Sequence, residues 1–180
     1  MRFAVLGSGS QGNGTLIASG DTFILVVGGF SLRETERRLA LLGVKAAQLS
    51  AVLVTHEHAD HVHGVGLLSR RYNVPVYLSQ GTLRGMRKPV EVAGFLACGD
   101  TLGIGALQVS AARVEHDAYE PLQYVISDGR RRFGMLTDLG CYDARLLERY
   151  QGLDALLIEA NHCRDLLARG HYPHFLKLRV

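Results

Sequence analysis

The sequence is poor in cysteine and has no long apolar run, and both absences limit what the protein can be. Its 180 residues include only Cys98, Cys141 and Cys163, and no two of them have the CxxC spacing. An odd set without such a pair argues against a disulfide framework and suits a reducing cytoplasm, where we expect the protein. No apolar stretch approaches the ~20 residues of a membrane-spanning helix, so we expect no membrane partner.

A strong charge and a secretion signal are also absent. The formal net charge is +3 at pH 7, a mild excess that permits nucleic-acid binding without predicting it. The start, MRFAVLGSGS, has no hydrophobic signal region followed by a cleavage site, so we interpret it as mature sequence. With 47% hydrophobic and 21% charged residues, the chain is typical of a globular protein, and we expect one domain over residues 1–180.

Strand-like and helix-like patterns alternate along the chain, which predicts an α/β layered fold. Strands are expected at residues 2–6, 15–18, 22–27, 51–54, 74–78, 133–137 and 155–158. Helices are expected from a capping box at Ser31 to Gly43, and at residues 61–72, 144–150 and 164–168. Three apolar runs lead into His56, Asp138 and Glu159. These residues therefore follow the C-terminal ends of expected strands, and ligands usually bind at the C-terminal edge of an α/β sheet.

Half of the eight histidines lie in the stretch VLVTHEHADHVHG. His56 and His58 are two residues apart, so both side chains can face the same way in an extended loop. Asp60 and His61 follow where the chain turns into a helix, so they can face a second position nearby. Imidazole and carboxylate groups are ligands that zinc or manganese prefers, and two such ions could bridge a water and make it a hydroxide nucleophile. A solvated histidine-rich loop is the alternative, but the HxHxDH spacing at a strand end favours a metal site.

Residues 56–64, HEHADHVHG, resemble the HxHxDHxxG signature of the metallo-β-lactamase-fold hydrolases. The likeness extends over nearly the whole chain and is closest to the small bacterial YycJ-like branch. It runs through GSGSQGNGT, VEHDAYEP, LTDLG, IEANH and YPHFLKLR. The resemblance implies a four-layer αββα sandwich of two similar halves, with two divalent metal ions, Zn or Mn, at one edge of the sheets.

The same resemblance implies a set of metal ligands. Its first metal would be held by His56, His58 and His116, and its second by Asp60 and His61, with Asp138 bridging both. Asp60 is also a candidate catalytic residue. An isolated histidine such as His116 is more often packing or surface, and an aspartate such as Asp138 often caps a turn, but their VEHD and LTDLG contexts favour ligation.

Two further stretches are weaker candidates for substrate contacts. The glycine-rich loop GSGSQGNGT can bring backbone N–H groups close to a phosphate, although a tight turn between strands explains it equally well. The resemblance favours a loop beside the metals, with Ser10 and Asn13 as candidate substrate contacts. After the last apolar run, Asn161 is a candidate substrate contact and His162 a candidate for substrate contact or proton transfer, with an exposed turn as the alternative.

Several arginines and a lysine could steer a polyanion toward the site. The run RRR at residues 130–132 is more often a solvated hairpin. The other candidates are Arg70, Arg71, Arg84, Arg87 and Lys88.

The chain departs from the family pattern in two places. The family stretch ILVDCGFS reads ILVVGGFS here, so Val27 stands where an aspartate supports the metal site. The loss of such a supporting carboxylate typically lowers metal affinity or activity roughly ten- to a hundredfold. The family's last metal-ligating histidine lies beyond the YP…LK.R segment, in which this chain stops at Val180. We therefore expect a fold truncated at its C-terminus relative to the family and a weakened second metal.

These observations predict a metal-dependent hydrolase, most consistent with a phosphodiesterase or exonuclease acting on DNA or RNA through a metal-bound hydroxide. A thioester or small-ester hydrolase is the alternative enzyme, since the fold does not choose between these chemistries. A metal-binding protein with impaired activity is a third possibility, because of Val27 and the absent histidine. A basic groove leading to the metals would favour the nuclease. A narrow apolar pocket would favour the thioester enzyme.

Overall fold

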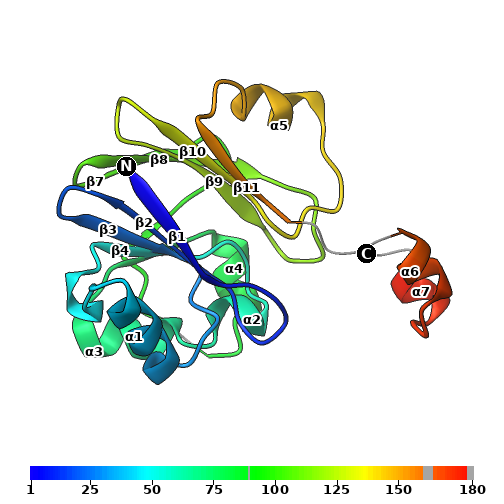
Figure 1. The fold of residues 1–180 in the computed structure, drawn as a ribbon, viewed down its shortest axis with the longest axis horizontal. Helices are drawn as coiled ribbons and strands as arrows, with labels where there is room; N and C mark the ends of the chain where they lie inside the picture. Colours follow the sequence, from blue (N-terminus) through cyan, green and yellow to red (C-terminus); the bar gives the residue numbers. More distant parts are fainter. Residues whose placement is uncertain (89, 160–163, 178–180) are drawn as a thin grey trace.

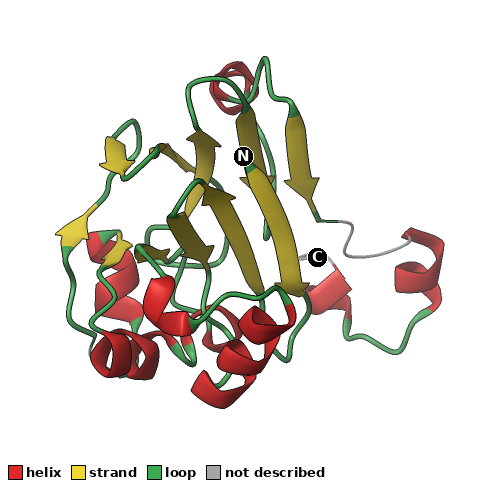
Figure 2. Cartoon of the chain, turned by 60° about the vertical axis from the view of Figure 1, so that its left-hand side comes forward, coloured by secondary structure: helices red, strands yellow, loops and turns green. Residues whose placement is uncertain are grey.

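Two β-sheets face each other in the computed structural model, which describes residues 1–88, 90–159 and 164–177 (Figures 1 and 2). The first sheet has the order β1 (Arg2–Gly7), β2 (Gly14–Ser19), β3 (Thr22–Val26), β4 (Ala51–Leu53), β5 (Val76–Leu78) and β6 (Gly94–Phe95). The second has the order β11 (Ala155–Ile158), β10 (Arg132–Leu136), β9 (Leu122–Ser127), β8 (Leu107–Arg113) and β7 (Thr101–Ile104). Both sheets mix parallel and antiparallel pairs.

Helices cover the outer faces of both sheets (Figure 1). The first sheet is covered by α1 (Leu32–Leu41) and α3 (Val65–Tyr72), with the short α2 (Ala59–Val62), α4 (Gln80–Gly85) and 3-10 turn η1 (Ala46–Gln48) nearby. On the second sheet, α5 (Ala144–Arg149) packs through Leu146. The remaining helices, α6 (Arg164–Arg169) and α7 (His174–Lys177), are drawn apart from the sheets in Figure 1. This arrangement confirms the expected αββα layering.

Alternation along the strands divides the apolar residues between two cores. On β4, Leu53 faces the core between the sheets, where it joins Ile24, Tyr124 and Phe133, whereas Val52 faces the helices. Because β4 is covered on both faces, its sequence is a continuous apolar run rather than an alternating one. Within the described ranges, no helix has the length and apolar character needed to cross a bilayer.

The expected helix over residues 61–72 is interrupted at Gly64, so α2 and α3 are separate. At this point two chain segments cross in direct backbone contact. A Cβ atom at Gly64 would lie 2.1 Å from the carbonyl oxygen of Phe30, and one at Gly29 would lie 1.6 Å from that of Asp60. Only glycine allows so close an approach. The crossing therefore fixes where α2, and the histidines around it, lie relative to the first sheet.

Candidate metal centre

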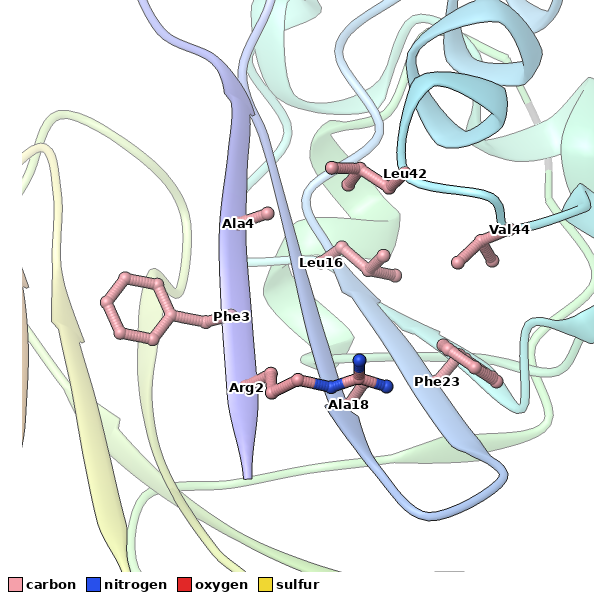
Figure 3. A pocket seen from close by; sticks show the side chains of 8 residues that line it. All are labelled: Arg2, Phe3, Ala4, Leu16, Ala18, Phe23, Leu42 and Val44. Atoms are coloured by element: carbon pink, nitrogen blue, oxygen red, sulfur yellow. The ribbon is translucent and has the colours of Figure 1, made fainter.

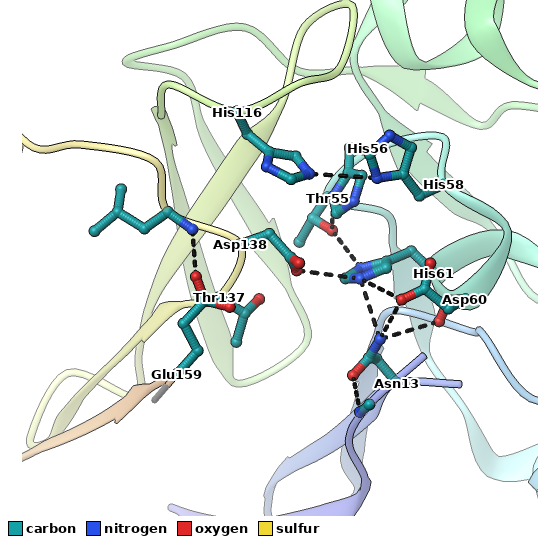
Figure 4. Close-up of polar contacts among 12 residues, drawn as sticks. Asn13, Thr55, His56, His58, Asp60, His61, His116, Thr137, Asp138 and Glu159 are labelled. Atoms are coloured by element: carbon teal, nitrogen blue, oxygen red, sulfur yellow. Dashed lines mark hydrogen bonds and ion pairs between the residues drawn. The ribbon is translucent and has the colours of Figure 1, made fainter. Parts of the chain in front are cut away.

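Three histidines from both halves of the fold form a first cluster. His56 follows β4, His58 is the N-cap residue of α2, and His116 follows β8 of the other sheet. Their ligand nitrogens lie within 4.8 Å of one another, and His116 Nε2 is 3.3 Å from His58 Nδ1. Figure 4 shows the three rings converging. The described residues thus bring together the three histidines to which the resemblance assigned the first metal.

A second cluster adjoins the first and shares His56 with it. Its members are His56, His61 and Asp138, and His61 Nε2 lies 3.1 Å from Asp138 Oδ2. Asp60 approaches from the other side, with its Oδ2 3.5 Å from His61 Nε2. His56 is common to both clusters, and Asp60 contacts only the second. The expected bridging role of Asp138 stays a prediction.

The donor set fits a divalent cation. His56 Nε2 is buried and has no hydrogen-bond partner among the described residues, although a buried polar atom without a partner is costly. Thr55 fixes the other side of the site, since its hydroxyl lies 3.0 Å from His56 Nδ1 and 3.2 Å from His61 Nδ1. A metal-ligating histidine usually has its second ring nitrogen held in this way. Thr55 was missed as a site residue, although its position directly before His56 is a signal for it.

The electrostatics of the metal-free cluster separate its two buried histidines. Burial, aided by the nearby charge of His61, lowers the pKa of His56 to about 2, so this imidazole is neutral and free to act as a ligand. Burial also opposes charging of His61, but hydrogen bonds to Asp138 and Asp60 raise its pKa to about 9. The metal-free site therefore holds a proton on His61, between two carboxylates, and a metal ion that binds His61 must displace this proton.

Asn13 connects the glycine-rich loop to the second cluster. Its Nδ2 donates a hydrogen bond to Asp60 Oδ2 at 2.9 Å and lies 3.1 Å from His61 Nε2. Its Oδ1 accepts a hydrogen bond from the backbone N–H of Gly9 at 2.9 Å. The loop thus lies beside the second cluster, where the resemblance placed it. In this arrangement Asn13 orients Asp60, and Ser10 is the exposed member of the candidate pair.

An open groove of about 540 Å³ leads from the second cluster along the edge strands β1 and β11. Its volume is in the range of ligand sites. Asp60 and Asp138 line it together with Ser10 and Glu159, and no lysine or arginine is among its described lining residues. Its apolar wall consists of Val5, Val26, Val27, Met135, Leu157 and Ile158.

Val27 adopts a backbone conformation that its side chain disfavours. Its φ angle is 68°, in the left-handed region, where a β-branched residue is a genuine outlier. Aspartate and asparagine enter this region more readily. The strain explains why β3 ends at Val26 instead of the expected residue 27. Val27 is buried and lines the same groove as Asp60 and Asp138, so its side chain lies in the neighbourhood where the family has a carboxylate.

The remaining candidates have different outcomes. Glu159 accepts a hydrogen bond from the backbone N–H of Leu139 at 2.5 Å, so it anchors the loop that carries Asp138. Asn161 and His162 lie outside the described residues. In the RRR run, Arg131 pairs with Asp154 at 2.9 Å and Arg132 donates to backbone carbonyls. These contacts tie Arg131 and Arg132 to the segment that connects α5 to β11.

A second pocket, of about 200 Å³, lies on β1 and β2 opposite the end of α1 (Figure 3). Leu16, Leu42 and Val44 line it, while Phe3 points away toward the other sheet and stacks on Phe133. Its described lining contains no histidine and no carboxylate, so this pocket offers no metal-ligating group.

Comparison with known proteins agrees with this geometry. The model of the β-lactamase superfamily domain matches residues 22–175. The chain is 33% identical over 185 residues to exodeoxyribonuclease YycJ of Bacillus anthracis, a match that covers 100% of this chain and 70% of that protein. It is 32% identical over 186 residues to exodeoxyribonuclease WalJ of Streptococcus pneumoniae, and that match covers 99% of this chain and 69% of that protein.

A solved structure with the same fold is the metallo-β-lactamase fold protein YhfI from Bacillus subtilis. It has a TM-score of 0.68 and 20% identity, and the match covers 86% of this chain and 69% of that one. The HxHxDHxxG motif, the two facing sheets and the match of the superfamily model lead to one assignment. The chain belongs to the metallo-β-lactamase superfamily, and its resemblance to the YycJ-like branch is confirmed.

Proposed function

We propose that the protein is a metal-dependent phosphodiesterase that hydrolyses DNA or RNA, with Zn or Mn ions at both clusters. The observation that carries this proposal is the pair of adjoining clusters sharing His56, in a chain whose whole length is similar to proteins named exodeoxyribonucleases. His56, His58 and His116 would hold one ion, and His61 with Asp138 and Asp60 the other. Bound divalent ions supply Lewis acidity at phosphoryl oxygens and lower the pKa of water.

The protein's own groups prepare the site for this chemistry. Thr55 orients His56 and His61. The hydrogen bond to His61 outweighs the effect of burial and lowers the pKa of Asp60. Asp60 is held by Asn13 and stays ionised, so its carboxylate is available to accept a hydrogen bond from an attacking water and orient it, and it remains a candidate catalytic residue. His162 is a candidate for proton transfer, and Ser10 and Asn161 are candidate substrate contacts.

One feature favours a second candidate, a thioester or small-ester hydrolase. The groove beside the second cluster has an apolar wall and no cationic lining among the described residues, which suits an acyl group better than a polyanion. We rank this function second because the two relatives reported above, whose matches cover all or nearly all of this chain, are named as nucleases. The low cysteine content supports a cytoplasmic location for either enzyme.

The deciding experiment compares the two chemistries in one preparation. Purified protein is loaded with Zn or Mn, its metal content is measured, and turnover is followed on labelled single- and double-stranded DNA, on RNA and on a glutathione thioester. We expect hydrolysis of nucleic acid that disappears in a His58→Ala variant. Thioester turnover far above nuclease turnover would reverse the ranking. No turnover of any substrate by the fully loaded protein would favour an inactive metal-binding protein.

A further inference from the structure

Tyr119 is a large aromatic residue held in the open beside the first cluster. It lies three residues after His116 in the loop between β8 and β9, and its side chain is 70% exposed. Its backbone N–H donates a 2.9 Å hydrogen bond to Glu57 Oε1. Because Glu57 stands between His56 and His58 in the chain, the metal-binding loop itself fixes the position of Tyr119. Sequence reasoning assigned no role to either Glu57 or Tyr119.

The last turn of α4 makes room for the Tyr119 ring. A Cβ atom at Gly85 would lie 2.8 Å from Tyr119 Cδ2 and 2.5 Å from Glu57 Cγ, so a larger residue there would displace one of them. The same loop is tied to the start of α4 through Glu120, whose Oε2 accepts the N–H of Gly81 at 2.8 Å. The exposed ring is thus carried by a residue pair anchored to the histidine loop through Tyr119 and to α4 through Glu120, which reduces the entropy lost when a flat ligand stacks on the ring.

Exposed cations flank Gly85, the residue that lies against this ring, in the sequence. Arg84 precedes Gly85, and Arg87 and Lys88 follow shortly after the helix. All three are exposed, and no ion pair is recorded for them in the described part of the chain. By contrast, Arg71 lies 3.6 Å from Glu36 and Arg131 is paired with Asp154. The rim formed by α4 therefore presents positive charge, which the groove along β1 and β11 lacks.

We infer that Tyr119, Arg84, Arg87 and Lys88 form a subsite for an unpaired nucleotide adjacent to the scissile phosphate. An aromatic face combined with cations is the arrangement that binds single-stranded nucleic acid, since bases stack on the ring and phosphates lie along the charges. A base inside a duplex has no free face to offer, so the subsite selects single-stranded ends or unpaired segments. This inference rests on the proposed function, whose substrate class it narrows.

The test measures binding separately from hydrolysis. Manganese-loaded protein is titrated into a fluorescein-labelled single strand with phosphorothioate linkages, and the dissociation constant is obtained from fluorescence anisotropy. We expect Tyr119→Ala to raise it roughly fivefold or more, the lower limit for stacking of one base, and Tyr119→Phe to leave it within about twofold. A double Arg84→Gln, Arg87→Gln variant should reduce the slope of log affinity against log salt by about 1.4, at roughly 0.7 per phosphate contact.

Two controls keep the result specific. Tyr142→Ala removes another exposed tyrosine, 67% exposed, and should bind like the unmodified protein. A strand with abasic residues should bind the unmodified protein and Tyr119→Ala equally. Unchanged binding in Tyr119→Ala, or an equal loss in Tyr142→Ala, overturns the subsite. Hydrolysis of bis(p-nitrophenyl) phosphate, which has no nucleobase, is measured in parallel. Failure of that reaction in the unmodified protein counts against the proposed function and leaves the binding result to decide the subsite.

Discussion

The hydroxyl group of Tyr124 donates a hydrogen bond to the backbone carbonyl oxygen of Val54 at 2.7 Å. Tyr124 lies in β9 of the second sheet and is fully buried, while Val54 ends the apolar run two residues before His56. Burial raises the pKa of Tyr124, so the hydroxyl keeps the proton that it donates. This bond connects the two sheets two residues before the first histidine of the candidate metal centre. It therefore helps to fix where the histidine loop begins after β4.

Replacing Tyr124 with phenylalanine should therefore lower stability. The change removes the donor and leaves the Val54 carbonyl buried, which costs about 1–3 kcal/mol in the free energy of unfolding. Urea denaturation of the metal-free protein measures the effect. Tyr77→Phe is the matched control, because no hydrogen bond of the Tyr77 hydroxyl is recorded among the described residues. Equal loss in both variants would show that the bond to Val54 contributes nothing.

Metal content should depend on His58 and not on His63. His58 is in the first cluster, whereas His63 lies two residues beyond His61 and is exposed. We expect His58→Ala to lose metal at the first cluster and His63→Ala to keep the full content, as measured by elemental analysis after dialysis. A His58→Ala protein with undiminished metal would contradict the assignment of this cluster.

Asn13 and Ser10, from one loop, should give separable effects. Asn13→Ala removes the hydrogen bond that orients Asp60, so we expect the affinity of the second metal to fall roughly ten- to a hundredfold. Ser10→Ala should leave metal affinity unchanged and raise KM for the nucleic acid. Ser10 lines the groove, and no hydrogen bond between its side chain and a candidate metal-ligating residue is recorded among the described residues. Calorimetric metal titration and steady-state kinetics distinguish the two outcomes. A metal affinity unaffected by Asn13→Ala would mean that Asp60 needs no orienting partner.

Val27→Asp should strengthen the second metal site. The substitution places a carboxylate in the groove lined by Asp60 and Asp138 and suits the left-handed backbone at this position. We expect metal affinity to rise roughly ten- to a hundredfold. Val27→Asn relieves the same backbone strain without adding charge, so it should improve the affinity much less. If both variants bind metal equally, conformation and not charge is the limiting factor.

Metal binding at the second cluster should release a proton below pH 9. His61 in the metal-free protein has a pKa raised from 6.5 to about 9, so at pH 7 a metal ion must displace its proton, and apparent affinity should rise about tenfold per pH unit. Calorimetry in buffers with different ionisation enthalpies counts the protons released. His61→Gln should abolish this release, and release that persists in the variant would assign the proton to another group.

The raised pKa of His61 also predicts how the stability of the metal-free protein depends on pH. Because the pKa of His61 is higher in the folded state, its protonation stabilises the fold. The contribution is fully present below pH 6.5, the ordinary value, and is lost as pH rises through about 9. Urea denaturation across this range should show a decline that His61→Gln lacks. A metal-free protein whose stability is flat from pH 6.5 to 9 would contradict it.

Periodicity anticipated the buried strands that lead into the clusters, because a buried strand is a local apolar pattern. The HxHxDH spacing marked the histidine loop, whereas His116 and Asp138 were indicated by the resemblance to the family. The HEHADH stretch follows a run buried on both faces, so its place at a sheet edge could be inferred without coordinates. The interruption at Gly64 could not, because it arises from contact with Phe30, distant in the sequence. A glycine within a helical pattern is tolerated often enough that its presence alone does not predict a break.

The contacts around the ligands were likewise beyond the sequence. Asn13 reaches Asp60 across 47 positions and Tyr119 reaches Glu57 across 62. Nothing in the local pattern marks Asn13 as a partner of Asp60 rather than of a substrate. The approach of Asp138, from the second sheet, to His56 and His61, from the first, also depends on how the two sheets are set against each other, which no local signal records.

The crossing at Gly29 and Gly64 has a consequence for transplanting this centre into another scaffold. Each glycine lies against the backbone of the other segment, at Asp60 and Phe30 respectively, so the histidine loop has no independent shape that could be grafted. A functional transplant must carry residues 28–30 together with residues 55–64 as one discontinuous module. Natural recombination faces the same constraint. An exchange point between these two segments would combine a 28–30 segment and a 55–64 segment from different proteins, whose backbones need not fit at this crossing.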